Sequence, residues 1–497
     1  MGAQNETFGS RWTIIAASIG MAVGTGNIWR FPRVAAQWGG GTFLIALTIA
    51  VVVWAIPLLI GEFLMGYKTR MGNIAAFRDF IGRKYTWLGG WLAFCCLGIT
   101  FYYAVVAGWT FRYLIYSISG AIHPGVAGQA LWDTFISNPT ETIFFHFLAT
   151  VVTVAVIYRG IKGGIEKAIK VLLPSLFVML IILAIRAITL PGSMMGLRYL
   201  FVPEWGQLAS GRVWLEAFTQ AAWSTGAGWG LLMVYAVYAR EKEDIGRNCS
   251  IIAFADVLAG FFAGTAVVAT VFAMAPTVDV AVDFLGAGNV GLTFIYIVEL
   301  IADMPGGAFM AFVFFLALSA AAVSSLMAMV ELATTNLMNT GIDRKKAAIY
   351  AGIAIFILGI PSAYSIDFLD NQDWVWGVGL LISGLIVAFA MMKYGLEKAR
   401  AEINEVSDLY IGKWWCVLIR LFPVMFLIIF GWWVMQSIEW YPDNWWHPFE
   451  VFSTGTMVFQ WVLLAIVMYA LNNFLADNLQ EGALLERVEK KGDDVGV

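Results

Sequence analysis

Long apolar stretches recur along almost the whole of this 497-residue chain. Apolar residues make up 60% of it and charged residues 13%, against about 25% charged in a soluble domain. A helix of about 20 apolar residues can cross a bilayer, where every backbone polar group needs a partner within the protein. The sequence therefore predicts an all-α polytopic membrane protein. About twelve spans are expected, near residues 11–36, 41–67, 88–121, 143–159, 165–190, 213–239, 248–276, 308–339, 346–363, 374–396, 413–437 and 450–475.

The positions of Lys and Arg predict the orientation of these spans. The loops after even-numbered spans are basic, whereas residues 113–158, 248–343 and 421–486 contain no Lys or Arg. Because cytoplasmic loops carry the excess of basic residues, both termini and the loops after even-numbered spans are expected to be cytoplasmic. The predicted outer loops hold no Asn-x-Ser/Thr acceptor for glycosylation, since Asn138 is followed by Pro139, which suits a bacterial inner membrane.

Two of the spans are interrupted by glycine-rich segments. Ala22–Asn27 breaks the first span, and Ser224–Gly230 breaks the sixth. Glycine loosens a helix and leaves amides and carbonyls unpaired, which hydrocarbon tolerates only where polar groups lie nearby. Broken helices at corresponding points of two halves are a pointer to the binding site of a transporter.

The spacing of the two breaks predicts an internal repeat. Spans one to five form one half, residues 1–190, and spans six to ten form a second half, residues 191–400. Because five is an odd number, the second half must be inverted relative to the first. Residues 401–475 then add two further spans, and residues 476–497 form a cytoplasmic tail.

The first break offers polar groups of both signs. The half helix that starts at Gly26 points its positive N-terminal end at the membrane centre, where a carboxylate fits. The half helix before it ends with free carbonyls near Gly20, Ala22 and Val23, which suit a small hard cation. Ligands made only of oxygen favour an alkali or alkaline-earth ion over a transition metal. Facing spans add the side-chain oxygens of Asn27, Ser224, Asp256, Ser324 and Ser325.

Three features leave alternatives open. Ser324 and Ser325 also fit simple packing of small residues between helices. Glu62, a charge inside the second span, is expected either to accept hydrogen bonds from amides of the first break or to act as a structural brace. Gly286–Gly291 matches a dinucleotide-binding fingerprint but has no βαβ unit around it, so a helical cap over the outer vestibule is expected instead.

One motif resembles a known family. Ala22–Pro32, with the sequence AVGTGNIWRFP, is followed by Gly39–Gly41, and together they resemble the neurotransmitter:sodium symporter family. This resemblance extends from about Arg11 to the last span and implies the bacterial leucine-transporter fold, a 5+5 inverted repeat with helices 1 and 6 broken. Further matches are Glu62, Tyr102 and Tyr103 with Trp109, the glycine-rich part of span six, Ala321–Ser325 and Asp370–Gly377.

The resemblance also implies roles for individual residues. A first sodium site maps to Ala22, Asn27, Ser224 and Asp256, with the substrate carboxylate as a further ligand. A second sodium site maps to Gly20, Val23, Ala321, Ser324 and Ser325. The outer gate maps to Arg30 and Asp373, which would meet through water, and the lid over the substrate maps to Tyr103 and Trp223. Substrate-binding positions are Met21, Ala22, Thr25, Gly26, Ile99, Tyr103, Trp223, Ser224, Gly226, Trp229, Ser325 and Met329, with Ala328 beside them.

The chain departs from the family pattern in two places that bear on mechanism. The family closes its inner side with an Arg–Asp pair, but these positions hold Asn5 and Asn339, so the inner gate is expected to be weaker or differently built. Asp256 lies one helical turn before Gly260, the position at which chloride-independent relatives carry Glu. Because a fixed carboxylate then stands beside the first sodium, no chloride requirement is expected.

The combined prediction is a sodium-coupled symporter, with two sodium ions, that imports a neutral amino acid by alternating access. Trp223, Trp229, Met329 and Ile99 crowd the pocket and favour a small aliphatic or N-methylated substrate such as glycine, alanine, proline or betaine. Gly226 opens space and supports the alternative of an aromatic or broadly hydrophobic substrate. A channel or a substrate sensor on the same scaffold is the other class of hypothesis.

Some functions are not expected from this sequence. Three scattered histidines provide no intramembrane catalytic cluster, so an enzyme is not expected. The expected partners are a small zwitterion and the lipid bilayer, without nucleic acid or an obligatory protein partner.

Overall fold

The computed structural model describes residues 6–484 and consists of helices joined by short loops, with no strand longer than an isolated bridge in that range. Apolar side chains surround most of these helices, which is the pattern of segments buried in a bundle or a membrane. Within the described range, nine uninterrupted spans are long and apolar enough to cross a bilayer. They are α3–η2–α4 (Gly41–Thr69), η3–α6 (Arg83–Ser119), α8 (Pro139–Ile157), η4–α9 (Ile161–Ile188), α13 (Ile245–Met274), α17 (Gly307–Met338), α18 (Arg344–Tyr364), α19 (Ile366–Tyr394) and α21 (Trp414–Trp440).

Three of the predicted spans are not straight. The last consists of α22 (Thr454–Ala470) and α23 (Asn472–Asn478), which bend by 53°. The first and sixth spans are broken, as predicted. The first divides into α1 (Arg11–Ala22), a wider helical turn η1 (Gly26–Arg30) and α2 (Phe31–Gln37), and the sixth into α11 (Gly211–Ser224) and α12 (Leu231–Val237).

The break in the sixth span depends on glycine conformation. Gly226, Gly228 and Gly230 have φ angles of 72°, 90° and 75°, a region in which residues with a Cβ are strained. The chain therefore turns three times between α11 and α12 without forming a helix. This turn exposes backbone amides in the middle of the bundle.

Glu62 on α4 supplies a partner for these amides. Its side chain is fully buried, and Oε1 accepts a hydrogen bond of 2.6 Å from the amide of Gly228. The expectation that Glu62 serves the first break is therefore wrong; it serves the second. The reason is packing, because α4 lies against α12 so closely that a Cβ on Gly66 would stand 1.9 Å from the carbonyl oxygen of Met233.

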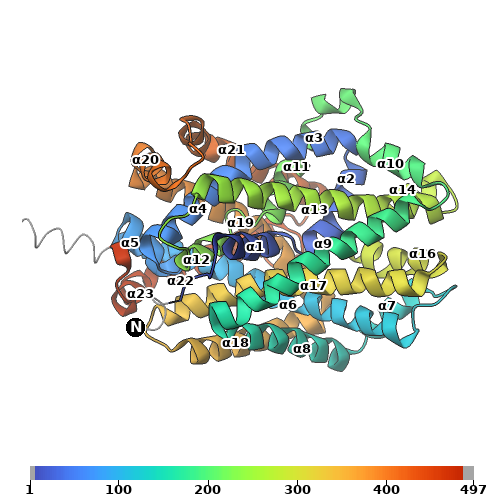
Figure 1. Cartoon of the computed structure of the whole chain (residues 1–497), viewed down its shortest axis with the longest axis horizontal. Coiled ribbons are helices and arrows are strands. Elements are labelled where there is room, and N and C mark those ends of the chain that lie inside the picture. The colour runs from blue at the N-terminus through green and yellow to red at the C-terminus, as the bar shows by residue number, and fades with distance from the viewer. Residues whose placement is uncertain (1–5, 485–497) are drawn as a thin grey trace, which may run out of the picture.

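The broken first span lies in the centre of the bundle. Figure 1 shows α1 in the middle of the molecule, and α9, α13 and α17 all pack against it. α17 is the most enclosed of these, with 94% of its most apolar stretch buried. This arrangement places the break after α1 beside α17 and within reach of the break after α11.

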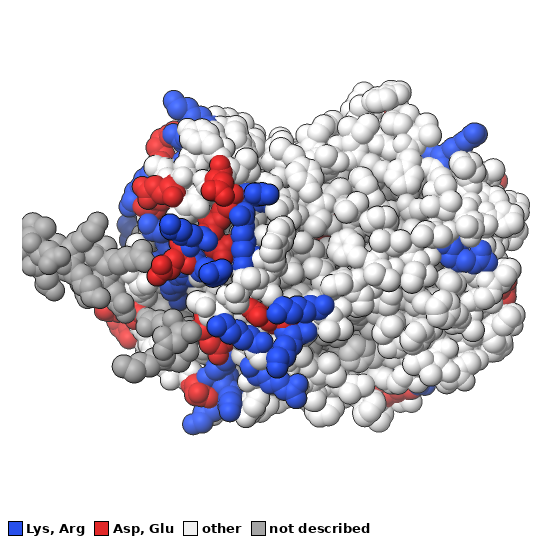
Figure 2. All heavy atoms as spheres, in the orientation of Figure 1, with Lys and Arg blue, Asp and Glu red and all other residues white. Residues whose placement is uncertain are grey.

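Charged residues gather at one end of the bundle. Figure 2 shows Lys, Arg, Asp and Glu crowded at the end that carries α5 (Asn73–Ile81), α20 (Leu396–Val406) and α23, while the middle of this face is almost free of charge. The ion pairs Lys68–Glu402 and Arg83–Asp477 lie there. We call this the charged end.

The Gly286–Gly291 segment is helical and belongs to a cap, as expected. It joins α14 (Val278–Gly286) to α15 (Gly288–Val290), η6 (Gly291–Tyr296) and α16 (Ile297–Asp303). Asn289 in this cap accepts a hydrogen bond of 2.8 Å from Nε of Arg33, just after the first break.

Replacing Glu62 by Ala is expected to lower the free energy of unfolding by about 1–3 kcal/mol, because the buried amide of Gly228 loses its partner. Thermal unfolding of the full chain in detergent measures this change. Glu405→Ala, which removes an exposed carboxylate on α20, is the matched control and should leave the melting temperature unchanged. Equal melting temperatures for the two variants would contradict the role given to Glu62.

Candidate functional site

A cavity lies between the two broken spans and is walled by α6 and α17 on its other sides. Its lining mixes backbone of both breaks with aromatic rings and a few polar side chains, which is the usual composition of a small-molecule site. The lining residues are Met21, Ala22, Gly24, Thr25, Gly26, Asn27, Trp29, Arg30, Tyr102, Tyr103, Val106, Gln220, Trp223, Ser224, Gly226, Trp229, Leu231, Asn289, Ser325, Met329 and Asp373.

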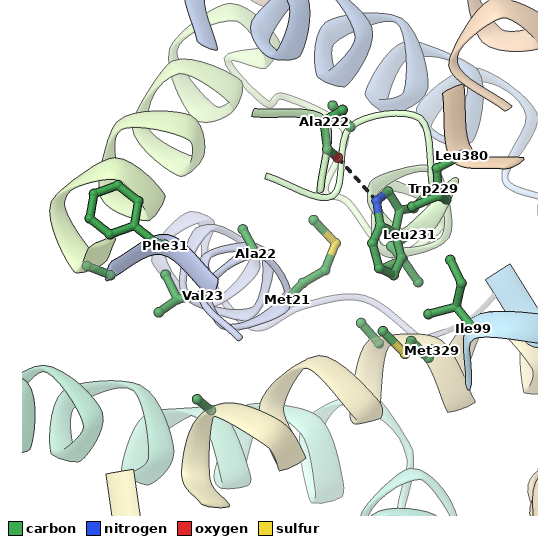
Figure 3. Close-up of a cluster of buried hydrophobic side chains, with 14 of the residues drawn as sticks. Met21, Ala22, Val23, Phe31, Ile99, Ala222, Trp229, Leu231, Met329 and Leu380 are labelled. Carbon is green, nitrogen blue, oxygen red and sulfur yellow. Dashed lines mark hydrogen bonds between the residues drawn. The ribbon is translucent and has the colours of Figure 1, made fainter. Parts of the chain in front are cut away.

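Most of the positions expected to bind substrate line this cavity, but Ile99 and Ala328 do not. Both are buried, with exposures of 0% and 1%. Ile99 belongs to the same buried apolar cluster as Trp229 and Met329, which do line the cavity (Figure 3). The sequence analysis did not single out Gln220 and Asn289, which also line the cavity. The sequence marks Gln220 only as a polar residue within a span and Asn289 only as a polar residue within the cap.

Asp256 on α13 joins the two breaks. Its Oδ1 accepts a hydrogen bond of 2.8 Å from Nδ2 of Asn27 and another of 2.9 Å from Oγ of Ser224. Oδ1 of Asn27 in turn accepts the amide of Gly24 at 3.0 Å. In a continuous helix that amide would donate to the carbonyl of Gly20, so the break frees this carbonyl.

The two serines of α17 lie against the end of α1. Oγ of Ser325 donates to the carbonyl of Met21 at 3.1 Å, and Oγ of Ser324 donates to the carbonyl of Ala321 at 2.9 Å. A Cβ added at Gly20 would lie 3.5 Å from Cβ of Ser324, so these two of the positions predicted for the second sodium site are neighbours.

These oxygens fit a hard cation. Freed carbonyls, hydroxyls, an amide oxygen and one carboxylate are the ligands that alkali ions accept. Within residues 6–484, no group of three His, Cys, Asp or Glu side chains is arranged to hold a metal ion. The donor set therefore favours an alkali ion over a transition metal.

The Tyr103 hydroxyl lies at the N-terminal end of the half helix that begins at Gly26, which is the positive end of its dipole. It accepts hydrogen bonds from the amide of Thr25 at 3.3 Å and from its hydroxyl at 3.2 Å. A Cβ at Gly24 would stand 2.5 Å from Oγ of Ser325 and 3.2 Å from the Tyr103 oxygen. A side chain at position 24 would displace the Ser325 hydroxyl and crowd that of Tyr103, so glycine leaves room for a small anionic group to reach the Thr25 amide.

Two indole rings shape the apolar part of the cavity. Trp223 and Trp229 meet edge to face with their ring centres 6.0 Å apart. Nε1 of Trp229 donates to the carbonyl of Ala222 at 3.3 Å, which fixes that ring across the cavity (Figure 3). A Cβ at Gly226 would lie 3.2 Å from the terminal methyl of Met21, so a flexible thioether covers the open position.

Arg30 and Asp373 line the same cavity but make no direct contact with each other. Arg30 bonds to Gln220 and lies 3.9 Å from the carboxylate of Glu216, and both partners belong to α11. Asp373 instead accepts a hydrogen bond of 2.7 Å from the hydroxyl of Tyr102. Glu216 was not expected in the outer gate, although its spacing of four residues from Gln220 places both on one helix face.

Of the two inner positions singled out in the sequence, the structure describes Asn339. Asn5 lies outside the described residues. Oδ1 of Asn339 accepts the amide of Gly72 at 2.7 Å, immediately before α5. Asn339, which is itself buried, therefore caps the start of a largely buried helix.

Comparison with known proteins identifies relatives along nearly the whole chain. The sequence profile of the sodium:neurotransmitter symporter family matches residues 5–134 and 134–477. An uncharacterized sodium-dependent transporter of Methanocaldococcus jannaschii is 30% identical over 430 residues, or 83% of this chain and 87% of that protein. A second such transporter, from Bacillus subtilis, is 29% identical over 444 residues, or 85% of this chain and 96% of that protein.

A solved structure shares the fold. The crystal structure of MhsT in complex with L-phenylalanine superimposes with a TM-score of 0.77 at 30% identity, over 86% of this chain and 99% of that one. The broken first and sixth spans described above therefore belong to a fold of the leucine-transporter type.

Proposed function

Because this chain belongs to the sodium:neurotransmitter symporter family, we propose that it imports a small neutral amino acid together with two sodium ions by alternating access. Its activity is sodium-dependent transport across a membrane and not catalysis. We propose three further properties of this transport: the class of amino acid, the number of sodium ions and the absence of a chloride requirement.

The observation that carries this proposal is the position of Asp256. Its carboxylate contacts Asn27 of the first break and Ser224 of the second. A sodium ion that replaces these hydrogen bonds is held by both broken spans at once. The carboxylate of the substrate, bound at the Thr25 amide and Tyr103, completes this site, so each improves the binding of the other.

The driving force is adequate for accumulation. A tenfold sodium gradient supplies about 1.4 kcal/mol per ion, and 100 mV supplies about 2.3 kcal/mol per charge. Two ions therefore supply about 7 kcal/mol, enough for roughly five decades of accumulation.

The size of the cavity supports a small substrate. The ring of Trp229 is held by its bond to the carbonyl of Ala222, and the cavity volume is about 100 Å³, which suits an amino acid with a short side chain. The face of an indole also attracts a methylated ammonium by about 1–2 kcal/mol when it is shielded from water, which extends the proposal to N-methylated amino acids.

One observation favours an aromatic or larger apolar substrate as the second candidate. Gly226 carries no side chain, and the methyl of Met21 that covers it can swing away. A relative of similar fold, MhsT, was crystallised with L-phenylalanine.

The proposal includes the membrane topology. The charged end is assigned to the cytoplasm of a bacterial cell, with both termini on that side, because basic residues concentrate in cytoplasmic loops (Figure 2). The proposed organisation keeps residues 1–190 and 191–400 as inverted halves.

Uptake into proteoliposomes under an inward sodium gradient separates the two substrate classes. Glycine, alanine, proline and betaine are expected to accumulate, and tryptophan and phenylalanine are not. Trp229→Phe, which removes part of the indole, should extend uptake to larger side chains. Uptake of the aromatic amino acids alone would support the second candidate, and no sodium-driven uptake of any amino acid would refute the proposal.

Asp256→Asn is expected to weaken sodium binding at least about tenfold, because the site loses its only fixed negative charge. The sodium dependence of substrate binding measures this, in buffers with and without chloride. Asp279→Asn, on the exposed face of α14, is the control. Wild-type transport should persist without chloride, and a variant with unchanged sodium dependence would remove Asp256 from the ion site.

Tyr103→Phe is expected to raise the dissociation constant of the amino acid about tenfold, because one hydrogen bond to its carboxylate is lost. Equilibrium binding of labelled substrate at saturating sodium tests this. Tyr364→Phe, at an exposed tyrosine of α18, should bind as the wild type does. Equal affinities in all three proteins would contradict the role of Tyr103.

A further inference from the structure

A second cavity lies on the side of the bundle, at the end opposite the charged end. It is bounded by the last turns of α9 (Glu166–Ile188), by α10 (Ser193–Phe201) and by the second half of α13. Figure 1 shows these three helices together at that end of the molecule. The volume of this cavity is about 510 Å³, against about 100 Å³ for the cavity between the broken spans. We call it the lateral groove.

The groove forms because the chain folds back after α9 and lays α10 on α13. Oγ of Ser193 donates to the carbonyl of Ile188 at 2.8 Å and so holds the turn between α9 and α10. A Cβ added at Gly196 would lie 2.8 Å from the carbonyl oxygen of Val268, so α10 approaches the backbone of α13 closely. Both α9 and α10 pack against α13, and the groove remains between them.

The lining of the groove is almost entirely apolar. Ile185 and Met194 are both 59% exposed and Val202 is 58% exposed, although all three line a cavity. The hydroxyl of Thr265 already donates to the carbonyl of Phe261 at 2.7 Å, so the lining offers a water molecule little to bind. Because α9 is a membrane span, the groove adjoins lipid. An acyl chain is the occupant that such a surface favours.

One charged side chain stands at the rim of this groove. Arg198 is exposed on α10, and within residues 6–484 its guanidinium takes part in no ion pair or side-chain hydrogen bond. Arg186 at the end of α9, by contrast, donates to the carbonyl of Pro305 at 2.9 Å. Tyr199 and Trp205, which follow Arg198, are exposed aromatic residues of the kind that gathers at headgroup depth. The free donors of Arg198 are therefore placed beside lipid headgroups.

The chemistry of the rim selects among lipids. A guanidinium offers a planar fork of donors that matches the oxygens of a phosphate. In phosphatidylcholine the phosphate is accompanied by a cation of its own, which repels the arginine, whereas phosphatidylglycerol carries a net negative charge. An anionic phospholipid thus supplies both an apolar chain for the groove and an anion for Arg198.

We propose that the lateral groove binds one acyl chain of an anionic phospholipid, whose phosphate pairs with Arg198. The bound lipid bridges α10, which leads into the first half of the broken sixth span, to α13, which carries Asp256. In the proposed topology this lipid belongs to the outer leaflet. The site goes beyond the proposed function, because it does not depend on which solute is carried.

Native mass spectrometry of the full chain in detergent, titrated with phosphatidylglycerol, tests the charged part of the site. The wild type is expected to bind one phosphatidylglycerol at least about tenfold more tightly than phosphatidylcholine with the same chains. Arg198→Gln should lose this preference. Arg212→Gln removes another exposed arginine, which instead stacks on Trp38 and Trp432, and should keep the preference.

A second variant tests the apolar part of the site. Ile185→Trp fills the groove with an indole and should weaken binding of phosphatidylglycerol about tenfold, because the acyl chain loses its place. Val178→Trp, two turns earlier on α9 and outside the groove, is the matched control. Both positions are exposed, so both variants should melt as the wild type does when no lipid is added.

Phosphatidylglycerol with a photoreactive diazirine in one chain locates the bound lipid, and the labelled peptides should come from residues 181–202 and from the second half of α13. Wild-type binding that does not distinguish the two lipids would overturn the proposal, as would wild-type affinity in Arg198→Gln or in Ile185→Trp. Displacement of the lipid by equimolar glycerol phosphate would also overturn it, since the groove would then contribute nothing. These measurements need no transported substrate, so a failure of amino acid uptake would refute the proposed function alone.

Discussion

The structure depends on the need to satisfy backbone polar groups at two breaks in an apolar interior. An unpaired amide or carbonyl there costs several kcal/mol in hydrocarbon, so each break needs partners from other helices. Glu62 provides one for Gly228, Asn27 for Gly24, and Ser325 for the carbonyl of Met21. These contacts hold α4 and α17 against the breaks, and Asp256 does the same for α13.

The groups that satisfy the breaks are also the groups that ions and a zwitterion can use. Asp256, Asn27 and Ser224 already bond to each other, so a bound cation substitutes one set of contacts for another without exposing new polar surface. The same holds for the Tyr103 hydroxyl, which bonds to the Thr25 amide. Under the proposed function, binding therefore requires little reorganisation of the fold, and ligands held by both broken spans would bias how those spans move together.

The two ends of the bundle are held by different chemistry. At the end near the cap, Arg30 contacts Glu216 and Gln220 while Asp373 is held by Tyr102, so the charges expected to pair have other partners within reach. At the charged end, Arg344 and Glu331 are in direct contact and out of water. Each charge near the cap therefore has more than one polar partner within reach, whereas the pair at the charged end is a single close contact out of water.

Hydropathy, glycine placement and one specific motif were enough to predict the helical spans, the two breaks and most residues of the cavity. These features are local, because a run of apolar residues or a glycine cluster acts on its own segment. The sequence did not predict that Glu62 serves the second break, that Ile99 does not line the cavity, that Glu216 faces Arg30, or that Asn339 caps α5. Each of these depends on the angle and depth at which helices distant in sequence pack against one another. The sequence by itself determined where the chain must unwind, and only the tertiary structure decided which side chains meet the groups that unwinding exposes.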